Sequence, residues 1–233
     1  MLRRLAGATV AAGLVGCFSL VATAQEIARL YAPQAPAGSS YVRVVNATQK
    51  PKKIEFGNRS DILGADAGRI ATDYRVVDAG VELMLKVEGR APARIRIKPD
   101  SFVTLVLDDS GQLPAIVDAT GERNDLKAEL RFYNLARGCN ATLAIENGPA
   151  VFQHIDYGLS ARRSVNPVQA RLLGSCATGV IDSAAAAKPA VTPATALPPL
   201  KSGDRASLFL LGDSAHPRLT VQTDATEPYA AAH

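Results

Sequence analysis

The chain has 233 residues, of which 47% are hydrophobic and 21% are charged, with a formal net charge of +4. These proportions are those of an ordinary globular protein, and they exclude a disordered, collagen-like or coiled-coil chain. The positive charge is too small for a protein that binds nucleic acid through bulk electrostatics, so we expect no nucleic-acid partner.

The first 24 residues have the layout of a secretory signal peptide. Two basic residues, Arg3 and Arg4, precede an apolar run from Leu5 to Val21, and Ala22-Thr23-Ala24 supplies the small residues of a cleavage site. No later apolar run reaches the ~20 residues that a membrane span needs. We therefore expect export to a bacterial periplasm with cleavage after Ala24, and lipoprotein acylation at Cys17 is the alternative.

After residue 25, short strand-like runs alternate with turn signals. The runs Tyr41–Val45, Phe102–Leu107 and Ala206–Leu211 are examples, and Asp109-Ser110-Gly111 is one of the turns. No segment shows a sustained helical period with caps. Strands that recur every ~8–12 residues predict an all-β fold of the sandwich or barrel type.

Two strand sequences occur twice, and this repetition predicts two tandem β-sandwich domains joined by a short linker. Residues 41–47 resemble residues 129–135, each with an Arg inside the strand and an Asn at its exit, and 104–107 resemble 207–210. We predict a signal peptide at 1–24, an N-terminal domain at 25–120, a linker at 121–126, a C-terminal domain at 127–224 and a tail at 225–233. The Ala/Pro-rich stretch 184–200 is predicted to be a mobile or extended loop of the second domain.

Only Cys139 and Cys176 remain after cleavage, in an oxidising compartment where thiols pair. The sequence therefore predicts a structural disulfide, worth about 4 kcal/mol in the chain-entropy model. A redox pair would favour Cys-x-x-Cys spacing, and a metal site would need further His or Cys nearby, whereas only His154 lies between the two cysteines. We expect no metal and no cofactor.

Catalytic motifs are missing from the sequence, with one partial exception at Asp213-Ser214-Ala215-His216. This segment resembles the Gly-Asp-Ser block of certain esterases and acetyltransferases. A catalytic triad needs its three groups to converge from separate segments, which one tight turn cannot provide. We therefore predict a β-turn here and no catalytic residues.

Two basic stretches are candidates for binding a polymer or a partner. In the first, Arg94, Arg96 and Lys98 alternate with isoleucines, so the cations point to one face of a strand. The second contains Lys50, Lys52 and Lys53, with Arg43 and Arg59 nearby in sequence. One interpretation is that these stretches bind an acidic polysaccharide or the acidic surface of a partner. The other is that the first stretch is an edge strand protected by charges and the second is a solvated turn.

The segment Leu30-Tyr31-Ala32-Pro33 to Asn46-Ala47 resembles the start of the mature chain in the alginate biosynthesis AlgF family, and Leu130–Leu135 resembles its second half. The resemblance implies an exported protein of two linked β-sandwich domains that is required for O-acetylation of alginate, an acidic exopolysaccharide. It also implies an adaptor that works beside separate periplasmic acetyltransferases. The resemblance assigns no binding residues position by position.

From these observations we expect a non-catalytic periplasmic adaptor in alginate O-acetylation, peripheral to the membrane-bound biosynthetic complex. It would bind acetyltransferase partners and, at its basic surface, the polyuronate. Two alternatives remain open: an acetyl-relay subunit with a nucleophile such as Ser214, and a general periplasmic β-sandwich binding module.

Overall fold

The computed structural model describes residues 37–56, 59–64, 68–78, 80–120, 124–177 and 189–227. Within these ranges the chain forms strands and turns and no helix, which confirms the all-β prediction. Accordingly, no described segment is a helix with the length and hydropathy needed to cross a membrane. The predicted signal peptide, Cys17 and positions 184–188 of the Ala/Pro-rich stretch lie outside the described residues.

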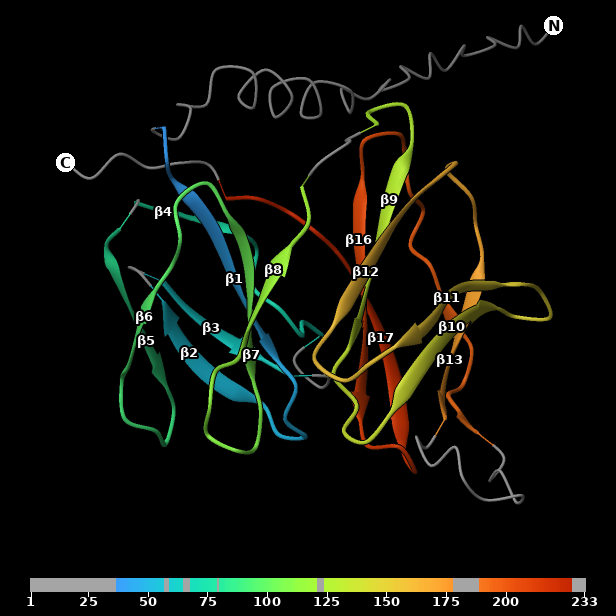
Figure 1. The fold of residues 1–233 in the computed structure, drawn as a ribbon, viewed down its shortest axis with the longest axis horizontal. Coiled ribbons are helices and arrows are strands. Elements are labelled where there is room, and N and C mark those ends of the chain that lie inside the picture. Colours follow the sequence, from blue (N-terminus) through green and yellow to red (C-terminus); the bar gives the residue numbers. More distant parts are fainter. Residues whose placement is uncertain are drawn as a thin grey trace, which may run out of the picture.

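The N-terminal half consists of two sheets whose inward faces share one hydrophobic core (Figure 1). The strand order is β4-β1-β7-β8 in one sheet and β3-β2-β5-β6 in the other. The strands are β1 Ser40–Asn46, β2 Lys52–Phe56, β3 Arg59–Leu63, β4 Arg75–Val77, β5 Glu82–Val87, β6 Ala93–Arg96, β7 Phe102–Leu107 and β8 Ala115–Asp118.

The C-terminal half repeats this arrangement strand by strand. Its sheets have the orders β12-β9-β16-β17 and β11-β10-β13-β14, and β15 also pairs with β13. The strands are β9 Ala128–Asn134, β10 Asn140–Ile145, β11 Ala150–Ile155, β12 Ser160–Val165, β13 Arg171–Ala177, β14 Ala190–Val191, β15 Thr195–Ala196, β16 Arg205–Gly212 and β17 Pro217–Thr223. Each strand of the N-terminal half therefore has an equivalent in the C-terminal half, which adds β15.

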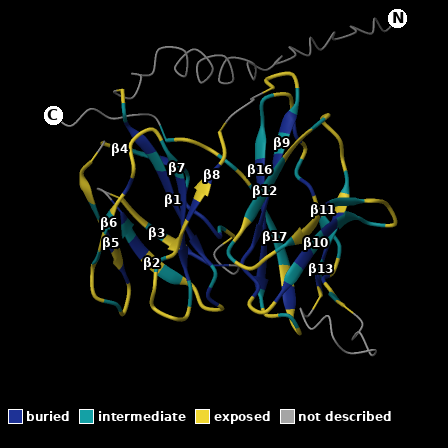
Figure 2. Cartoon of the chain, in the orientation of Figure 1, coloured by how far each residue is buried: buried dark blue, intermediate teal, exposed yellow. Residues whose placement is uncertain are grey.

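The central strands of the two facing sheets are buried on both sides. In each half the central pair is parallel, β1 with β7 and β9 with β16, while the other ladders are antiparallel. One face of each pair covers the core of its own sandwich, and the other face meets the opposite sandwich (Figure 2). This burial explains why these strands are almost continuously apolar, as parallel strands covered on both faces usually are.

The asparagine at the exit of each repeated strand joins the two sheets of its sandwich. The side-chain amide of Asn134 donates to the carbonyls of Cys139 and Ile155, at 2.7 and 2.8 Å, and its oxygen accepts from the Ala136 N–H at 3.1 Å. Asn46 makes the corresponding bonds in the N-terminal half, including one of 2.7 Å to the Leu63 carbonyl. The repeated Asn therefore satisfies backbone groups where the chain passes from one sheet to the next.

The predicted disulfide is confirmed. Cys139 bonds Cys176 with a Cα–Cα distance of 5.1 Å, which is within the usual range for disulfides. Both side chains are buried, and the bond joins the approach to β10 to the end of β13. It therefore reinforces two neighbouring strands of the outer C-terminal sheet.

Two segments predicted to be irregular make backbone pairs. In residues 189–200 of the Ala/Pro-rich stretch, β14 and β15 pair with β13, and the side chains of Leu197 and Leu200 are buried. The tail predicted from residue 225 begins as a docked segment, because Thr226 forms a parallel bridge with Tyr74 of the N-terminal half. In both places, backbone pairing overrides the local composition that suggested a loop or a tail.

We predict that Asn134→Ala destabilises the protein by about 1–3 kcal/mol, because two buried carbonyls and one N–H lose their partner. The unfolding free energy from urea denaturation measures this loss. Asn140→Ala is the matched control, since the Asn140 amide binds Asp156 at the exposed surface, and it should change stability by less than about 0.5 kcal/mol. Equal effects of the two substitutions would contradict the role of Asn134.

Candidate functional site at the interface between the sandwiches

The two sandwiches meet through an apolar cluster on the outward faces of their central strands. The cluster comprises Val45, Ile70, Ala71, Val106, Ile116, Tyr133, Leu135, Phe209 and Leu211. The Gln222 side chain also crosses this interface, because its oxygen accepts from the backbone N–H groups of Ile70 and Ala71 and its amide donates to the Ala71 carbonyl. The two halves are therefore joined by packing and by directional hydrogen bonds.

A buried arginine lies within this interface. Arg43 on β1 is 1% exposed, and its guanidinium donates to Asp224 of the other half at 2.7 Å. It also donates to Thr104, Tyr133 and Ser207 at 2.8–2.9 Å. The guanidinium carbon lies 4.5 Å from the centre of the Tyr74 ring, within cation–π range.

A second buried acid, Asp118 at the end of β8, accepts three hydroxyl hydrogen bonds. They come from Tyr133 at 2.5 Å, Thr104 at 2.7 Å and Tyr74 at 2.9 Å. Tyr133 belongs to the C-terminal half, so the network links both sandwiches through acids on both sides. Buried polar groups are tolerated only when they are paired in this way.

The network fixes the protonation of its members. Burial raises the pKa of Tyr133, and it raises the pKa of Tyr74 well above its ordinary value, so both phenols remain protonated donors. Burial alone would lower the pKa of Arg43, but the combined attraction of Asp224, Tyr133, Tyr74 and Asp118 outweighs it and holds the pKa above its usual value. The interface therefore contains a buried ion pair between Arg43 and Asp224.

The residues of this network occupy equivalent positions in the two halves. Arg43 lies opposite Thr104 on neighbouring strands of one half, as Arg131 lies opposite Ser207 in the other. The bond from Thr104 to Asp118 corresponds to the 2.8 Å bond from Ser207 to Asp224. The interface therefore has approximate internal two-fold symmetry.

The symmetry is broken at Arg131, the equivalent of Arg43. Arg131 donates to Glu129 at 2.6 Å and to the Ala119 carbonyl at 3.2 Å, and the described contacts contain no ion pair from Arg131 to Asp118. Burial by itself would lower the pKa of Arg131, but Tyr74 and Glu129 raise it above its usual value. The equivalent arginines on the two sides of the interface, Arg43 and Arg131, therefore bind different partners.

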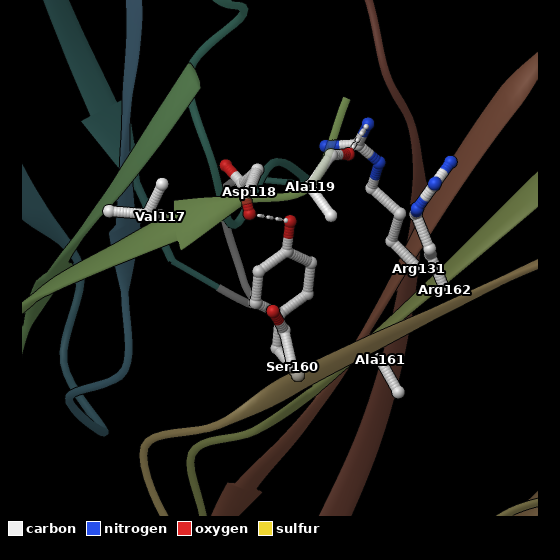
Figure 3. Close-up of a pocket in the computed structure, with 8 residues that line it drawn as sticks. Val117, Asp118, Ala119, Arg131, Ser160, Ala161 and Arg162 are labelled. Carbon is white, nitrogen blue, oxygen red and sulfur yellow. Dashed lines mark hydrogen bonds between the residues drawn. The ribbon is translucent and has the colours of Figure 1, made fainter. Parts of the chain in front are cut away.

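A pocket opens on the Arg131 side. It has a cavity volume of about 90 Å³, and it lies between the edge strands β8 and β12. Its lining consists of Val117, Asp118, Ala119, Arg131, Tyr133, Ser160, Ala161 and Arg162. Figure 3 shows Asp118 on one side of the pocket and the two arginines on the other. The space suits the tip of a side chain or a few waters rather than a whole sugar unit.

The first predicted basic stretch lies at an edge strand, away from this pocket. Arg94 and Arg96 point outward from β6, which forms one edge of the outer N-terminal sheet, and Lys98 is exposed just beyond it. Arg94 pairs with Glu82 at 3.2 Å on the neighbouring strand. Arg94, Arg96 and Lys98 therefore lie together, and Glu82 of β5 lies beside them.

The second basic stretch lies on the same sheet, but β5 separates β2 from β6. Lys53 points outward and pairs with Glu55 at 3.3 Å. Of the flanking lysines, Lys50 is exposed in the turn before β2, and Lys52 is partly exposed. Attraction by Lys53 and Lys86 lowers the pKa of Glu55, so this face mixes both signs of charge.

Arg43 and Arg59, which lie near the second stretch in sequence, do not join it in space. Arg43 is buried in the interface, and Arg59 pairs with Glu227 at 3.2 Å. The sequence signal that could have located Arg43 was its recurrence as Arg131 in the repeated strand. A second signal was missed: the tripeptide Asp118-Ala119-Thr120 recurs as Asp224-Ala225-Thr226.

The segment from Asp213 to His216 forms a turn, as predicted. The Asp213 carboxylate accepts from the backbone N–H groups of Ala215 and His216, at 2.9 and 2.8 Å, and these bonds lower its pKa. The exposed His216 ring lies 3.5 Å from the same carboxylate. This arrangement is a side-chain-capped turn of the kind that Asp commonly makes. Among the described residues, no cluster of three or more His, Cys, Asp or Glu could hold a metal ion.

Comparison with known proteins identifies the family. The family model described as "Alginate O-acetyl transferase AlgF" matches residues 12–182. The chain belongs to the AlgF family. The alginate biosynthesis protein AlgF of Pseudomonas aeruginosa is 32% identical over 159 residues, which cover 68% of this chain and 70% of that protein. The protein of the same name from Pseudomonas putida is 30% identical over 165 residues, or 70% of this chain and 74% of that one.

A structure of the N-terminal domain of AlgF from P. aeruginosa overlaps 37% of this chain and 100% of its own length. The sequence identity is 23% and the TM-score is 0.29, which is too low to establish a shared fold. The AlgF family match also ends before β14 to β17. Asp224, the partner of Arg43, therefore lies in the part of this chain beyond the family match.

We predict that Arg43→Met destabilises the protein by about 3–5 kcal/mol, because it leaves Asp224 buried without a counter-charge. Urea denaturation of the full chain measures the change. The double variant Arg43→Met/Asp224→Asn should recover part of the loss, since the uncompensated charge is then gone. Arg94→Met is the control at an exposed pair, where the expected change is below about 1 kcal/mol. A double variant no more stable than Arg43→Met alone would refute this account.

Proposed function

We propose that this member of the AlgF family is a non-catalytic periplasmic adaptor in the O-acetylation of alginate. The family match and the relatives named for alginate biosynthesis support the pathway. The export signal expected from the sequence supports the periplasm. In this role the protein binds the acetyltransferases of the alginate complex and holds them at the polymer.

The observation that carries the adaptor role is how the buried ionisable groups are used. Arg43, Asp224, Asp118, Tyr74 and Tyr133 are paired with one another, and all of these contacts except the Tyr74–Asp118 bond cross the interface. Such groups, when arranged for chemistry, present a nucleophile and a base toward open space. Here they hold two sandwiches in a fixed relation, which suits a scaffold that presents binding surfaces.

The rival role, an acetyl relay, is favoured by the description of the family as an O-acetyl transferase. It requires a nucleophile, and Ser214 is the side chain whose surroundings most resemble a catalytic block. Ser214 lies in a turn beside Asp213 and His216, and the Asp213 oxygen is occupied by backbone N–H groups. Activation of a serine nucleophile requires a base that an acid orients toward the serine hydroxyl.

We predict that the purified full chain forms no acetyl-serine when incubated with para-nitrophenyl acetate, as read by intact-mass and peptide mass spectrometry. Ser214→Ala is the matched variant, and it should behave as the parent does in both adduct formation and ester turnover. An acetyl group on Ser214, or turnover that Ser214→Ala abolishes, would establish the relay and overturn the adaptor proposal.

The polymer-binding surface is a separate part of the proposal. We predict that reversing Arg94, Arg96 and Lys98 to Glu weakens the binding of a mannuronate oligomer and reduces its salt dependence, because an acidic polymer is attracted by exposed cations and screened by salt. Isothermal titration calorimetry at two ionic strengths measures both effects. Lys127→Glu, in the connection before β9, is the control for a single charge reversal outside this stretch. Unchanged affinity in the triple variant would remove this stretch as the polymer site.

A further inference from the structure

The repeated Asp-Ala-Thr tripeptide lies where the last strand of each half ends. Asp224-Ala225-Thr226 leaves β17 of the C-terminal half and continues to Glu227 along the N-terminal half. Asp118-Ala119-Thr120 leaves β8 of the N-terminal half toward the C-terminal half. We call residues 224–227 the strap.

The strap binds the N-terminal half as a short added strand. Beside the first residue of β4, the Tyr74 N–H donates to the Ala225 carbonyl at 2.9 Å, and the Glu227 N–H donates to the Tyr74 carbonyl at 2.8 Å. The bridge between Tyr74 and Thr226 is parallel. The Glu227 carboxylate then binds Arg75 at 2.9 Å. Arg59 binds the same carboxylate at 3.2 Å, so the recognition combines open backbone groups with one acid and two arginines.

The C-terminal half has equivalent backbone positions on β12. Arg75 lies opposite Val42, and Arg163 lies opposite Leu130, which is the equivalent of Val42. Arg163 and Arg162 of β12 are therefore the equivalents of Arg75 and Tyr74. The Asn134 N–H donates to the Leu159 carbonyl, so the backbone groups of Leu159 face β9. Successive residues of an antiparallel strand direct these groups alternately toward the partner strand and away from it. The N–H and C=O of Arg162, three residues later, therefore point to the open edge.

This second position has no strap among the described residues. β12 is the edge of its sheet, and no described backbone hydrogen bond joins Arg162 to Ala119 or Thr120. Arg163 is exposed and donates to the Val151 carbonyl at 3.2 Å, and the described part of the chain provides it with no carboxylate. The pocket beside Arg131 and Arg162 opens at the same place.

We propose that the β12 edge at Arg162 and Arg163 binds an extended acidic peptide segment of a partner protein. The segment adds as a parallel strand whose backbone bonds Arg162 and whose carboxylate side chain binds Arg163, as the strap does on the other half. This inference rests on the proposed adaptor function and names the chemistry of the partner contact. Addition of a strand to an exposed edge is an established mode of peptide recognition.

The geometry favours a peptide over a uronate polymer at this site. Arg162 presents both a backbone donor and a backbone acceptor, and a peptide in a parallel strand supplies the complement of each. Glu129 lies 3.3 Å from the Arg162 guanidinium, and its negative charge opposes a dense polyanion. A single acid at the position of Glu227 avoids this repulsion and reaches the exposed Arg163.

The strap itself supplies the probe. A fluorescein-labelled peptide with the sequence of residues 220–228, Thr-Val-Gln-Thr-Asp-Ala-Thr-Glu-Pro, is titrated with the full chain by fluorescence anisotropy. We expect saturable binding that Arg163→Glu weakens about tenfold or more, because a charged hydrogen-bonded pair becomes a repulsive one. Replacing the Glu of the peptide by Gln should weaken binding similarly. Arg163→Lys should retain part of the affinity, and Arg96→Glu, on the distant β6 edge, should retain all of it.

Several results would overturn the inference. They are the absence of saturable peptide binding, equal binding by the parent and Arg163→Glu, and binding that appears only after Glu122→Ala, which would mean that the linker already fills the edge. Competition by a mannuronate oligomer at low concentration would assign the edge to the polymer instead. None of these results would produce an acetylated serine, so failure of this inference is distinguishable from failure of the adaptor proposal.

Discussion

The arrangement of the two sandwiches depends on the buried pair between Arg43 and Asp224. Removing a guanidinium and a carboxylate from water is costly, and the pair is tolerated because hydrogen bonds from Arg43 to Thr104, Tyr133 and Ser207 complete its geometry. The partners come from both halves, so the bonds exist together only when the halves are docked. The surrounding apolar cluster excludes water and strengthens the interaction.

Because the two halves repeat one fold, the interface between them has two equivalent sides, and these sides differ in their contacts. Equivalent arginines, hydroxyls and acids face one another across an approximate two-fold axis, yet the strap completes only the side that contains Arg43. On the other side, Arg131 binds Glu129 and the Ala119 carbonyl, and a pocket remains beside the edge of β12. Equivalent surfaces in a repeated fold thus differ in which described residues cover them, and the edge proposed to bind a partner peptide is the one that no described strand covers.

The two docked sandwiches of this AlgF protein expose two kinds of surface, the outer sheets and the strand edges. The outer sheets carry mixed charges, with cations such as Arg94 and Lys53 placed beside acids. Such faces favour weak, salt-sensitive contacts, whereas an open strand edge provides directional hydrogen bonds. An adaptor could use the first type of contact for a mobile polymer and the second for a protein partner.

The sequence alone determined the strand-rich fold, the disulfide between Cys139 and Cys176 and the turn at Asp213, because alternation, compartment and local hydrogen bonding act over short distances. It also showed that an Arg and an Asn recur in equivalent strands, although not what they do. Only the tertiary structure decided that Arg43 is buried against Asp224, some 181 positions away in the chain, and that residues 225–227 bind the opposite half. A charged side chain in an apolar strand has the same local pattern whether it meets solvent or a second sheet. Its role is set by the partner that packing brings to it, and that partner lies far beyond the range of local sequence signals.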